Sequence, residues 1–208
     1  MKKVLFSIAM LAMGTTVATA QEGYGFSKGD VIVEGMMSYN TRDNKNTSVE
    51  TSDFTFTPKV GYFVTNDIAV GLQIGYGSDV ENRYDANVKT TSSDFNVGVF
   101  GRYYFLDLGS KLKVYSEANV GFGNYETETE TGLGSVTTAE GTTFGINAGI
   151  GVNYFLTPKF AVNFALTDVI GYNTTKPEGG KSTNSFGLEV NQFNNFFNGA
   201  RFGLTFKF

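Results

Sequence analysis

The last eleven residues, "NGARFGLTFKF", alternate between apolar side chains and small or polar ones up to the end of the chain. Successive side chains of a β-strand point to opposite faces, so this segment has two chemically different faces. The apolar face consists of Ala200, Phe202, Leu204, Phe206 and Phe208. The other face consists of Gly199, Arg201, Gly203, Thr205 and Lys207. The class of protein depends on which of the two faces meets water.

The same alternation recurs in seven earlier segments, which predicts eight strands in all. The earlier segments have their apolar residues within 31–39, 54–62, 68–76, 95–105, 112–122, 144–154 and 160–172. A chain with 26 Gly, 20 Phe and 11 Tyr but only 3 Pro also favours all-β structure.

Short and long connections take turns along the chain. The short ones are 64–67, 106–110 and 156–159, and the long polar ones are 41–52, 78–92, 124–142 and 173–196. Strict alternation of this kind predicts an up-and-down meander whose two ends differ.

Charge separates the two faces of the eight segments. Apart from Asp168, the apolar face carries no Asp, Glu, Lys or Arg. In a soluble barrel the many glycines of the opposite face would meet water, where nothing requires their small size. If the apolar face meets lipid, those glycines instead make room inside a narrow barrel. Because an Arg or Lys facing lipid costs about 2–4 kcal/mol at mid-bilayer, the clean apolar face favours contact with lipid.

Aromatic residues collect at both ends of the segments, as at the two interfaces of a membrane. Those near the short connections are Tyr62, Tyr103, Phe105, Tyr154, Phe160 and Phe208. Those near the long connections are Tyr39, Phe54, Tyr76, Phe95, Phe122, Phe144 and Tyr172. We therefore predict an eight-stranded antiparallel up-and-down transmembrane β-barrel with short periplasmic turns and long extracellular loops.

The first twenty residues predict a secretory signal peptide. Lys2 and Lys3 precede an apolar run, which ends near the small-residue pattern Ala18-Thr19-Ala20. We expect cleavage after Ala20, so that residues 21–208 form a single barrel domain.

Composition excludes several classes of function. The net charge is −4, and loss of Lys2 and Lys3 makes the product more acidic, which argues against binding of nucleic acid. The absence of Cys and His removes disulfides, thiolate catalysis and most hydrolase triads. We expect no enzyme activity, no cofactor and no metal. The acidic stretch "ETETETG" (126–132) is interpreted as a solvated loop or strand extension, with Ca²⁺ binding or bridging of lipopolysaccharide as the alternative.

Residues 27–208 resemble the small eight-stranded outer-membrane β-barrels of Gram-negative bacteria, the OmpA/OmpX-like "porin family" barrel domains. The resemblance lies in the signal peptide, the eight alternating segments, the turn in "YFLTPKFAV" and the terminal "FGLTFKF". It implies an outer-membrane location. In that family the assembly machinery recognises a final aromatic residue, which implies this role for Phe208. The resemblance also makes outer-membrane lipid, lipopolysaccharide and the barrel assembly machinery the expected partners of a monomeric barrel.

The charged residues of the inner face are the candidate site. Glu34, Lys59, Arg102, Glu117 and Arg201 are predicted to form ion pairs that plug the lumen and fix the strand register. Neighbouring strands favour Glu34–Lys59 or Glu34–Arg201, together with Arg102–Glu117. The alternative is a path for protons or ions.

Four functions remain open at this stage. The preferred one is a non-enzymatic outer-membrane barrel with a structural or surface-interaction role, carried by its long loops. The alternatives are a narrow channel for small or hydrophobic solutes, an integral membrane enzyme acting on lipid or peptide, and a soluble ligand-binding barrel.

Overall fold

The structure, a computed structural model, describes residues 23–188 and 201–208. The predicted signal peptide lies outside these residues. The described chain forms nine β-strands: β1 (Val31–Asn44), β2 (Val49–Phe63), β3 (Ile68–Arg83), β4 (Val88–Leu108), β5 (Leu112–Thr131), β6 (Gly134–Thr157), β7 (Phe160–Pro177), β8 (Thr183–Leu188) and β9 (Arg201–Lys207).

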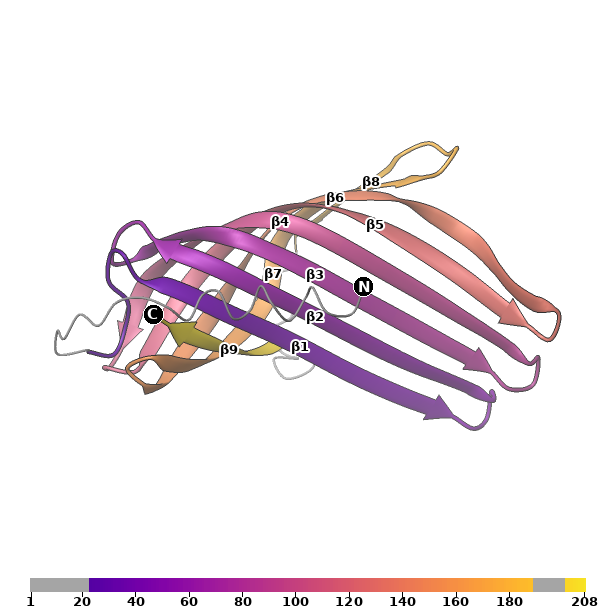
Figure 1. The fold of residues 1–208 in the computed structure, drawn as a ribbon, viewed down its shortest axis with the longest axis horizontal. Coiled ribbons are helices and arrows are strands. Elements are labelled where there is room, and N and C mark those ends of the chain that lie inside the picture. The colour runs from indigo at the N-terminus through magenta and orange to yellow at the C-terminus, as the bar shows by residue number, and fades with distance from the viewer. Residues whose placement is uncertain (1–22, 189–200) are drawn as a thin grey trace.

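The strands close into an eight-stranded antiparallel barrel (Figure 1). Each of β1 to β7 pairs with the next strand along the chain, and β9 pairs with both β7 and β1. β9 pairs with residues 160–165 of β7, whereas β8 pairs with residues 170–175 of the same strand. The two short strands thus occupy successive stretches alongside β7, at one position of the barrel. The predicted fold class is confirmed.

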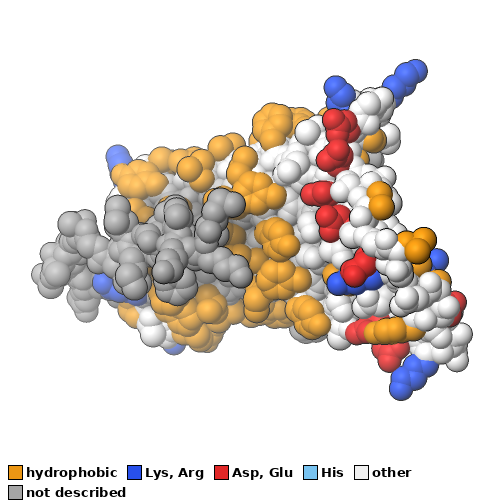
Figure 2. Space-filling view, turned by 45° about the vertical axis from the view of Figure 1, so that its right-hand side comes forward, with side chains coloured by type: hydrophobic (Ala, Val, Ile, Leu, Met, Phe, Trp, Pro, Cys, Tyr) orange, Lys and Arg blue, Asp and Glu red, His pale blue; other side chains and the backbone are white. Residues whose placement is uncertain are grey.

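The register places the apolar side chains on the outside of the barrel. Leu72, Val60 and Val99 are 65%, 53% and 52% exposed, although each is paired with a neighbouring strand of the barrel wall. Figure 2 shows hydrophobic side chains as a band across the visible face of the wall, with acidic side chains on one side of it. An uncovered apolar band of this extent marks a surface that meets lipid.

The long polar connections are mostly strand. At the end of the barrel opposite the short connections, the turns between strands cover only residues 45–48, 84–87, 132–133 and 178–182. The adjoining residues are rich in Thr, Ser and Val, which favour extended structure, and they pair across each hairpin. The predicted long loops are therefore long β-hairpins that project beyond the apolar band (Figure 1).

The strand that carries Asp168 is irregular at that residue. The register between β6 and β7 shifts between Ala148 and Gly149 and again between Ile150 and Gly151. Asp168 pairs with Gly149, between the two shifts. Each shift adds one unpaired residue to β7. Because the two extra residues together restore the alternation of side chains, Phe164 and Ile170 remain on one face of β7.

Large inward-facing side chains lie opposite glycines of the neighbouring strand. A Cβ atom on Gly71 would come within 2.6 Å of the Phe100 ring, and one on Gly151 within 2.2 Å of the Tyr115 ring. Gly71 is the register partner of Phe100, and Gly151 that of Tyr115. Glycine is needed at these positions because the narrow bore has no other space for the rings.

Candidate functional site

Four charged side chains from four strands meet inside the barrel. Glu34 comes from β1, Lys59 from β2, Arg102 from β4 and Glu117 from β5. Their exposed fractions are only 1%, 5%, 1% and 8%. Each residue lies on the inner face of its strand, because the apolar residues beside it in the sequence face outward. We call these four residues the lumen cluster.

Arg102 lies between the two carboxylates of the lumen cluster. It donates two parallel hydrogen bonds to Glu34, from Nη1 to Oε2 at 3.0 Å and from Nη2 to Oε1 at 2.9 Å. Its Nε donates to Glu117 Oε2 at 2.7 Å. Lys59 Nζ forms an ion pair with the other oxygen of Glu117. The cluster therefore contains two positive and two negative charges in one continuous chain of contacts across the bore.

Neutral polar groups complete the hydrogen bonding of Glu34. Asn163 Nδ2 and Thr205 Oγ1 both donate to Glu34 Oε2, at 2.6 and 2.8 Å. Asn153 Nδ2 in turn donates to Thr205 Oγ1 at 3.0 Å. These three side chains come from β6, β7 and β9 and are almost completely buried. Buried carboxylates need such donors, because an unsatisfied charge inside a barrel is costly.

Two tyrosines connect the charges to the wall of the barrel. Arg102 Nη1 donates to the Tyr104 hydroxyl at 3.1 Å, and that hydroxyl donates to Asn153 Oδ1 at 3.0 Å. The Tyr115 hydroxyl donates to Asn163 Oδ1 at 2.9 Å. The Arg102 guanidinium also lies 4.1 Å from the centre of the Tyr115 ring, which adds a cation–π contact.

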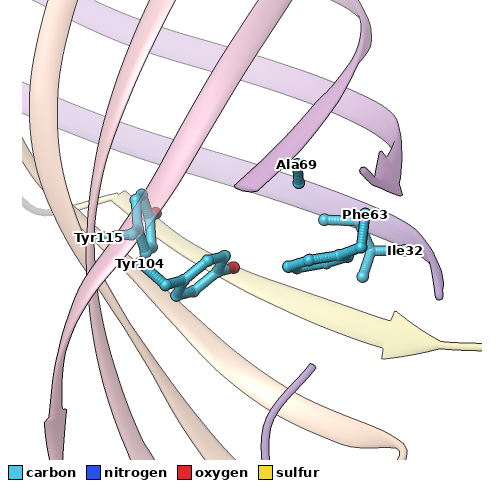
Figure 3. Packing of buried hydrophobic residues seen from close by; sticks show 5 residues of the cluster. All are labelled: Ile32, Phe63, Ala69, Tyr104 and Tyr115. Carbon is cyan, nitrogen blue, oxygen red and sulfur yellow. The ribbon is translucent and has the colours of Figure 1, made fainter. Parts of the chain in front are cut away.

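An apolar cluster fills the bore next to the charges, toward the short turns. Figure 3 shows five of its residues, Ile32, Phe63, Ala69, Tyr104 and Tyr115, projecting from different strands into the interior. The ring of Phe26, a residue that precedes β1, packs against this cluster. Its ring centre lies 4.4 Å from that of Phe63 and 4.8 Å from that of Tyr104. This end of the bore is therefore filled mainly by rings.

The chain before β1 is also held by polar contacts. Lys207 Nζ donates to the carbonyl oxygen of Gly25 at 3.0 Å and lies 3.8 Å from Asp30 Oδ2. The Lys28 N–H donates to Asn66 Oδ1 at 2.9 Å. These contacts fix the segment that carries Phe26 across the end of the barrel.

The predicted site residues fall into two places. The structure brings Glu34, Lys59, Arg102 and Glu117 together, and Arg102 does contact Glu117. Lys59 pairs with Glu117 rather than with its register partner Glu34, and Glu34 pairs with Arg102. Arg201 is exposed and lines a cavity on the other side of the lumen cluster, toward the long hairpins.

Sequence reasoning missed the contacts that cross the bore. It considered only neighbouring strands, whereas the Glu34–Arg102 pair joins β1 to β4, which do not pair with each other. It also left out Tyr104, Tyr115 and Thr205. The signal was present, because these three residues alternate in phase with Arg102, Glu117 and Lys207 on the inner faces of their strands.

The arrangement supports structure better than covalent chemistry. Both carboxylates of the lumen cluster are engaged by cations, and Glu34 accepts two further hydrogen bonds. Within residues 23–188 and 201–208, no group of three or more His, Cys, Asp or Glu side chains is placed to hold a metal ion.

Phe208 lies at the seam that closes the barrel. Its N–H donates to the carbonyl oxygen of Val31 at 2.9 Å, and the Val31 N–H donates to the carbonyl oxygen of Phe208 at 3.1 Å. The Phe208 side chain is 51% exposed on the outer face. The chain end is thus paired through its backbone while the ring remains accessible.

A closed barrel with an apolar outer band and charges inside defines an integral outer-membrane β-barrel. A family model described as the outer membrane protein beta-barrel domain matches residues 6–203, and the chain belongs to this family. Its location is the outer membrane. No helix in the described part of the chain is long and apolar enough to cross a membrane.

Two solved structures share the fold. The chain is similar to Neisserial surface protein A (NspA), with 17% identity, a TM-score of 0.50, and coverage of 88% of this chain and 99% of that one. It is similar to OprG from Pseudomonas aeruginosa, with 12% identity, a TM-score of 0.50, and coverage of 88% and 98%. No curated protein matches the sequence. At these identities the likeness extends to the fold alone.

Proposed function

We propose that this protein is a non-enzymatic outer-membrane barrel with a structural or surface-interaction role, whose lumen is plugged by its own side chains. The observation that carries the proposal is the lumen cluster. Four paired charges, each at most 8% exposed, cross the bore, and the rings around Phe26 pack next to them. An eight-stranded barrel has an interior that side chains just fill, so these two layers support a lumen that is closed to bulk water.

Conductance tests the plug. Purified protein in a planar bilayer should show no large, steady conductance. A Glu34→Ala/Arg102→Ala double variant removes one charge of each sign and the bulk of both side chains. If it still folds, it should leak more than the unmodified barrel. A steady conductance of the unmodified barrel would support the alternative function, a narrow channel for small solutes.

The projecting hairpins are the proposed interaction surface. They extend beyond the apolar band, are mainly polar, and present exposed side chains such as Tyr84, Leu133 and Phe186. Residues 128–137 form the tip of the β5–β6 hairpin, far along β5 from Glu117 of the lumen cluster. Replacing residues 128–137 with a two-residue turn should therefore preserve a folded barrel and change only surface binding. If the shortened barrel failed to fold, the hairpin would instead be part of the folding core.

Phe208 is the proposed assembly signal. Its accessible terminal ring, on a strand that closes the barrel, suits recognition by the barrel assembly machinery before closure. Phe208→Ala should lower the amount of folded barrel in the outer membrane, scored by heat-modifiable gel mobility, without changing refolding of the purified chain. Equal loss in both assays would point to a stability defect instead. Outer-membrane lipid and lipopolysaccharide are the other proposed partners of the barrel, which we propose acts as a monomer.

A further inference from the structure

A polar cavity of about 510 Å³ lies inside the barrel, between the lumen cluster and the projecting hairpins. Lys59, Glu117 and Tyr115 line it on the side of the lumen cluster. Its volume falls in the range of about 300–1,000 Å³ that is typical of small-molecule sites. Its lining differs from that of most such sites, because polar side chains prevail over apolar ones.

Side-chain amides are the main polar groups of the cavity wall. There are five of them, one from each of five strands, β3 to β7: Gln73, Asn96, Asn119, Asn147 and Asn173. The hydroxyls of Thr55, Thr57 and Thr143 add further donors and acceptors. Each amide offers two N–H donors and one acceptor oxygen, so this wall can bond a ligand that carries many hydroxyl groups.

Glycines keep the cavity open. Asn96 is the register partner of Gly75, and Asn173 is the register partner of Gly145. A Cβ on Gly75 would lie 2.3 Å from Asn96 Nδ2, and one on Gly145 would lie 2.8 Å from Asn173 Oδ1. These two amides therefore lie against the wall, over a neighbouring glycine, rather than across the bore.

One amide oxygen of the cavity wall lacks a hydrogen-bond partner among the described residues. Asn119 Nδ2 donates to Asn147 Oδ1 at 3.0 Å, but the buried Asn119 Oδ1 has no hydrogen-bond partner among the described residues. An unsatisfied buried acceptor destabilises the folded protein. A ligand hydroxyl that donates to this oxygen would remove that destabilisation.

Charge around the cavity disfavours anions, because Lys59 and Glu117 of the wall balance each other and three carboxylates at the outer end outnumber the remaining cation of the described wall, Arg201. Asp53, Asp79 and Asp94 lie further along the same inner faces as Thr55, Gln73 and Asn96, toward the hairpins. Asp79 and Asp53 are close enough to share a hydrogen bond, and Asp94 is close enough to add its charge. An anion entering from the hairpin side would pass these three carboxylates.

We infer that the cavity binds a neutral polyhydroxylated molecule, a sugar of one or two rings. The site does not depend on whether the lumen conducts, because the amides of its wall lie on the hairpin side of the lumen cluster. The wall supplies amides and hydroxyls for the sugar hydroxyls, and the carboxylates at the outer end discriminate against acidic sugars.

Titration of the refolded barrel with glucose and maltose tests this inference. The barrel should be held in a detergent without a sugar headgroup, and the side-chain amide signals of Asn119 and Asn147 followed by NMR. One or both sugars should shift these signals saturably, whereas gluconate should bind at least tenfold more weakly. No saturable shift with either neutral sugar, or equal binding of gluconate, would overturn the inference.

Asn119→Leu supplies the matching variant. It should weaken binding at least tenfold, followed through the Asn147 signal. Asn124→Leu is the control, because Asn124 is exposed on the outer face of the same strand, β5. Equal loss in both variants would contradict a site at Asn119. If Asn119→Leu fails to show heat-modifiable mobility, Thr143→Val serves in its place and should also weaken binding.

Discussion

At the scale of single residues, the lumen cluster depends on charge balance in a confined space. Arg102 is the central residue, because it bridges Glu34 and Glu117. Removing one member leaves its partners charged, buried and unpaired. Loss of one partner from a buried ion pair typically costs about 3–5 kcal/mol.

Arg102→Met should therefore lower the free energy of unfolding by about 3–5 kcal/mol in urea titrations of the refolded barrel. Arg83→Met is the control, because Arg83 pairs with Glu81 on an exposed hairpin, where its side chain is 59% exposed. We expect no measurable loss for the control. Equal urea midpoints for the two variants would show that the buried ion pairs of Arg102 stabilise the barrel no more than the exposed ion pair of Arg83.

Lipid exposure makes a second prediction at the residue scale. Leu72 and Val136 are both 65% exposed, but Leu72 lies in the apolar band and Val136 in the β5–β6 hairpin beyond it. In phospholipid vesicles, Leu72→Arg should destabilise the barrel by about 2–4 kcal/mol. Val136→Arg should have little effect, because its side chain meets water. Similar unfolding midpoints for the two variants would contradict the placement of the bilayer.

At the scale of strands, close approach across neighbouring pairs sets the shape of the bore. A Cβ on Gly71 would lie 2.1 Å from the carbonyl oxygen of Val60 and 2.7 Å from the Cα of Gly61. Both contacts are with backbone, which cannot move without displacing β2. A Cβ on Gly101 would meet nothing within 4 Å.

Gly71→Ala should destabilise the barrel by about 1–3 kcal/mol or more, as overpacked interiors do. Gly101→Ala should leave the urea midpoint near that of the unmodified barrel. A small effect at both sites would mean that β2 and β3 separate easily, against the geometry described above.

The carboxylates at the outer ends of β2, β3 and β4 make stability depend on pH. Asp79 lies beyond the aromatic residue Tyr76, outside the apolar band. Partial burial, a hydrogen bond with Asp53 and the negative charges of Asp53 and Asp94 together raise the pKa of Asp79. Because its folded pKa is raised, protonation of Asp79 favours the folded hairpin. This stabilisation is complete below its ordinary pKa of about 3.9 and is lost as pH rises through the raised value.

Amide hydrogen exchange measures this effect. After correction for intrinsic rates, the outer ends of β2 and β3 should be better protected near pH 4 than near pH 7. Asp79→Asn should raise protection at neutral pH and flatten the pH dependence. Asp85→Asn, in the turn at 84–87, should leave the pH dependence of this region in place.

At the scale of the whole molecule, the barrel has two parts. They are the apolar band, here called the belt, and the projecting hairpins, here called the crown. The belt needs lipid on its outside, and the bore within it holds the rings and the lumen cluster. The crown consists of long polar hairpins in water. Mutations that unfold the protein should therefore concentrate in the belt and the bore, whereas shortened hairpins should be tolerated.

Most of the architecture follows from local alternation. Eight segments whose apolar faces carry no charge apart from Asp168 determine strand number, sidedness and the outer-membrane class, because a shift of one residue would place Arg102 in hydrocarbon. The sequence also places Glu34, Lys59, Arg102 and Glu117 on the inner face. The sequence predicts loops where the structure has polar hairpins, because a strand that is polar on both faces lacks the alternation that marks a membrane strand.

What the sequence determined by itself is the face on which each side chain lies, since period two is a property of the extended backbone. Which inward side chains meet was decided only by closure of the barrel. Closure brings β1 opposite β4, joins Glu34 to Arg102, seats Phe26 against Phe63, and leaves a polar cavity on the far side of the charges. Those contacts depend on the curvature and stagger of eight strands together, and no single strand encodes them.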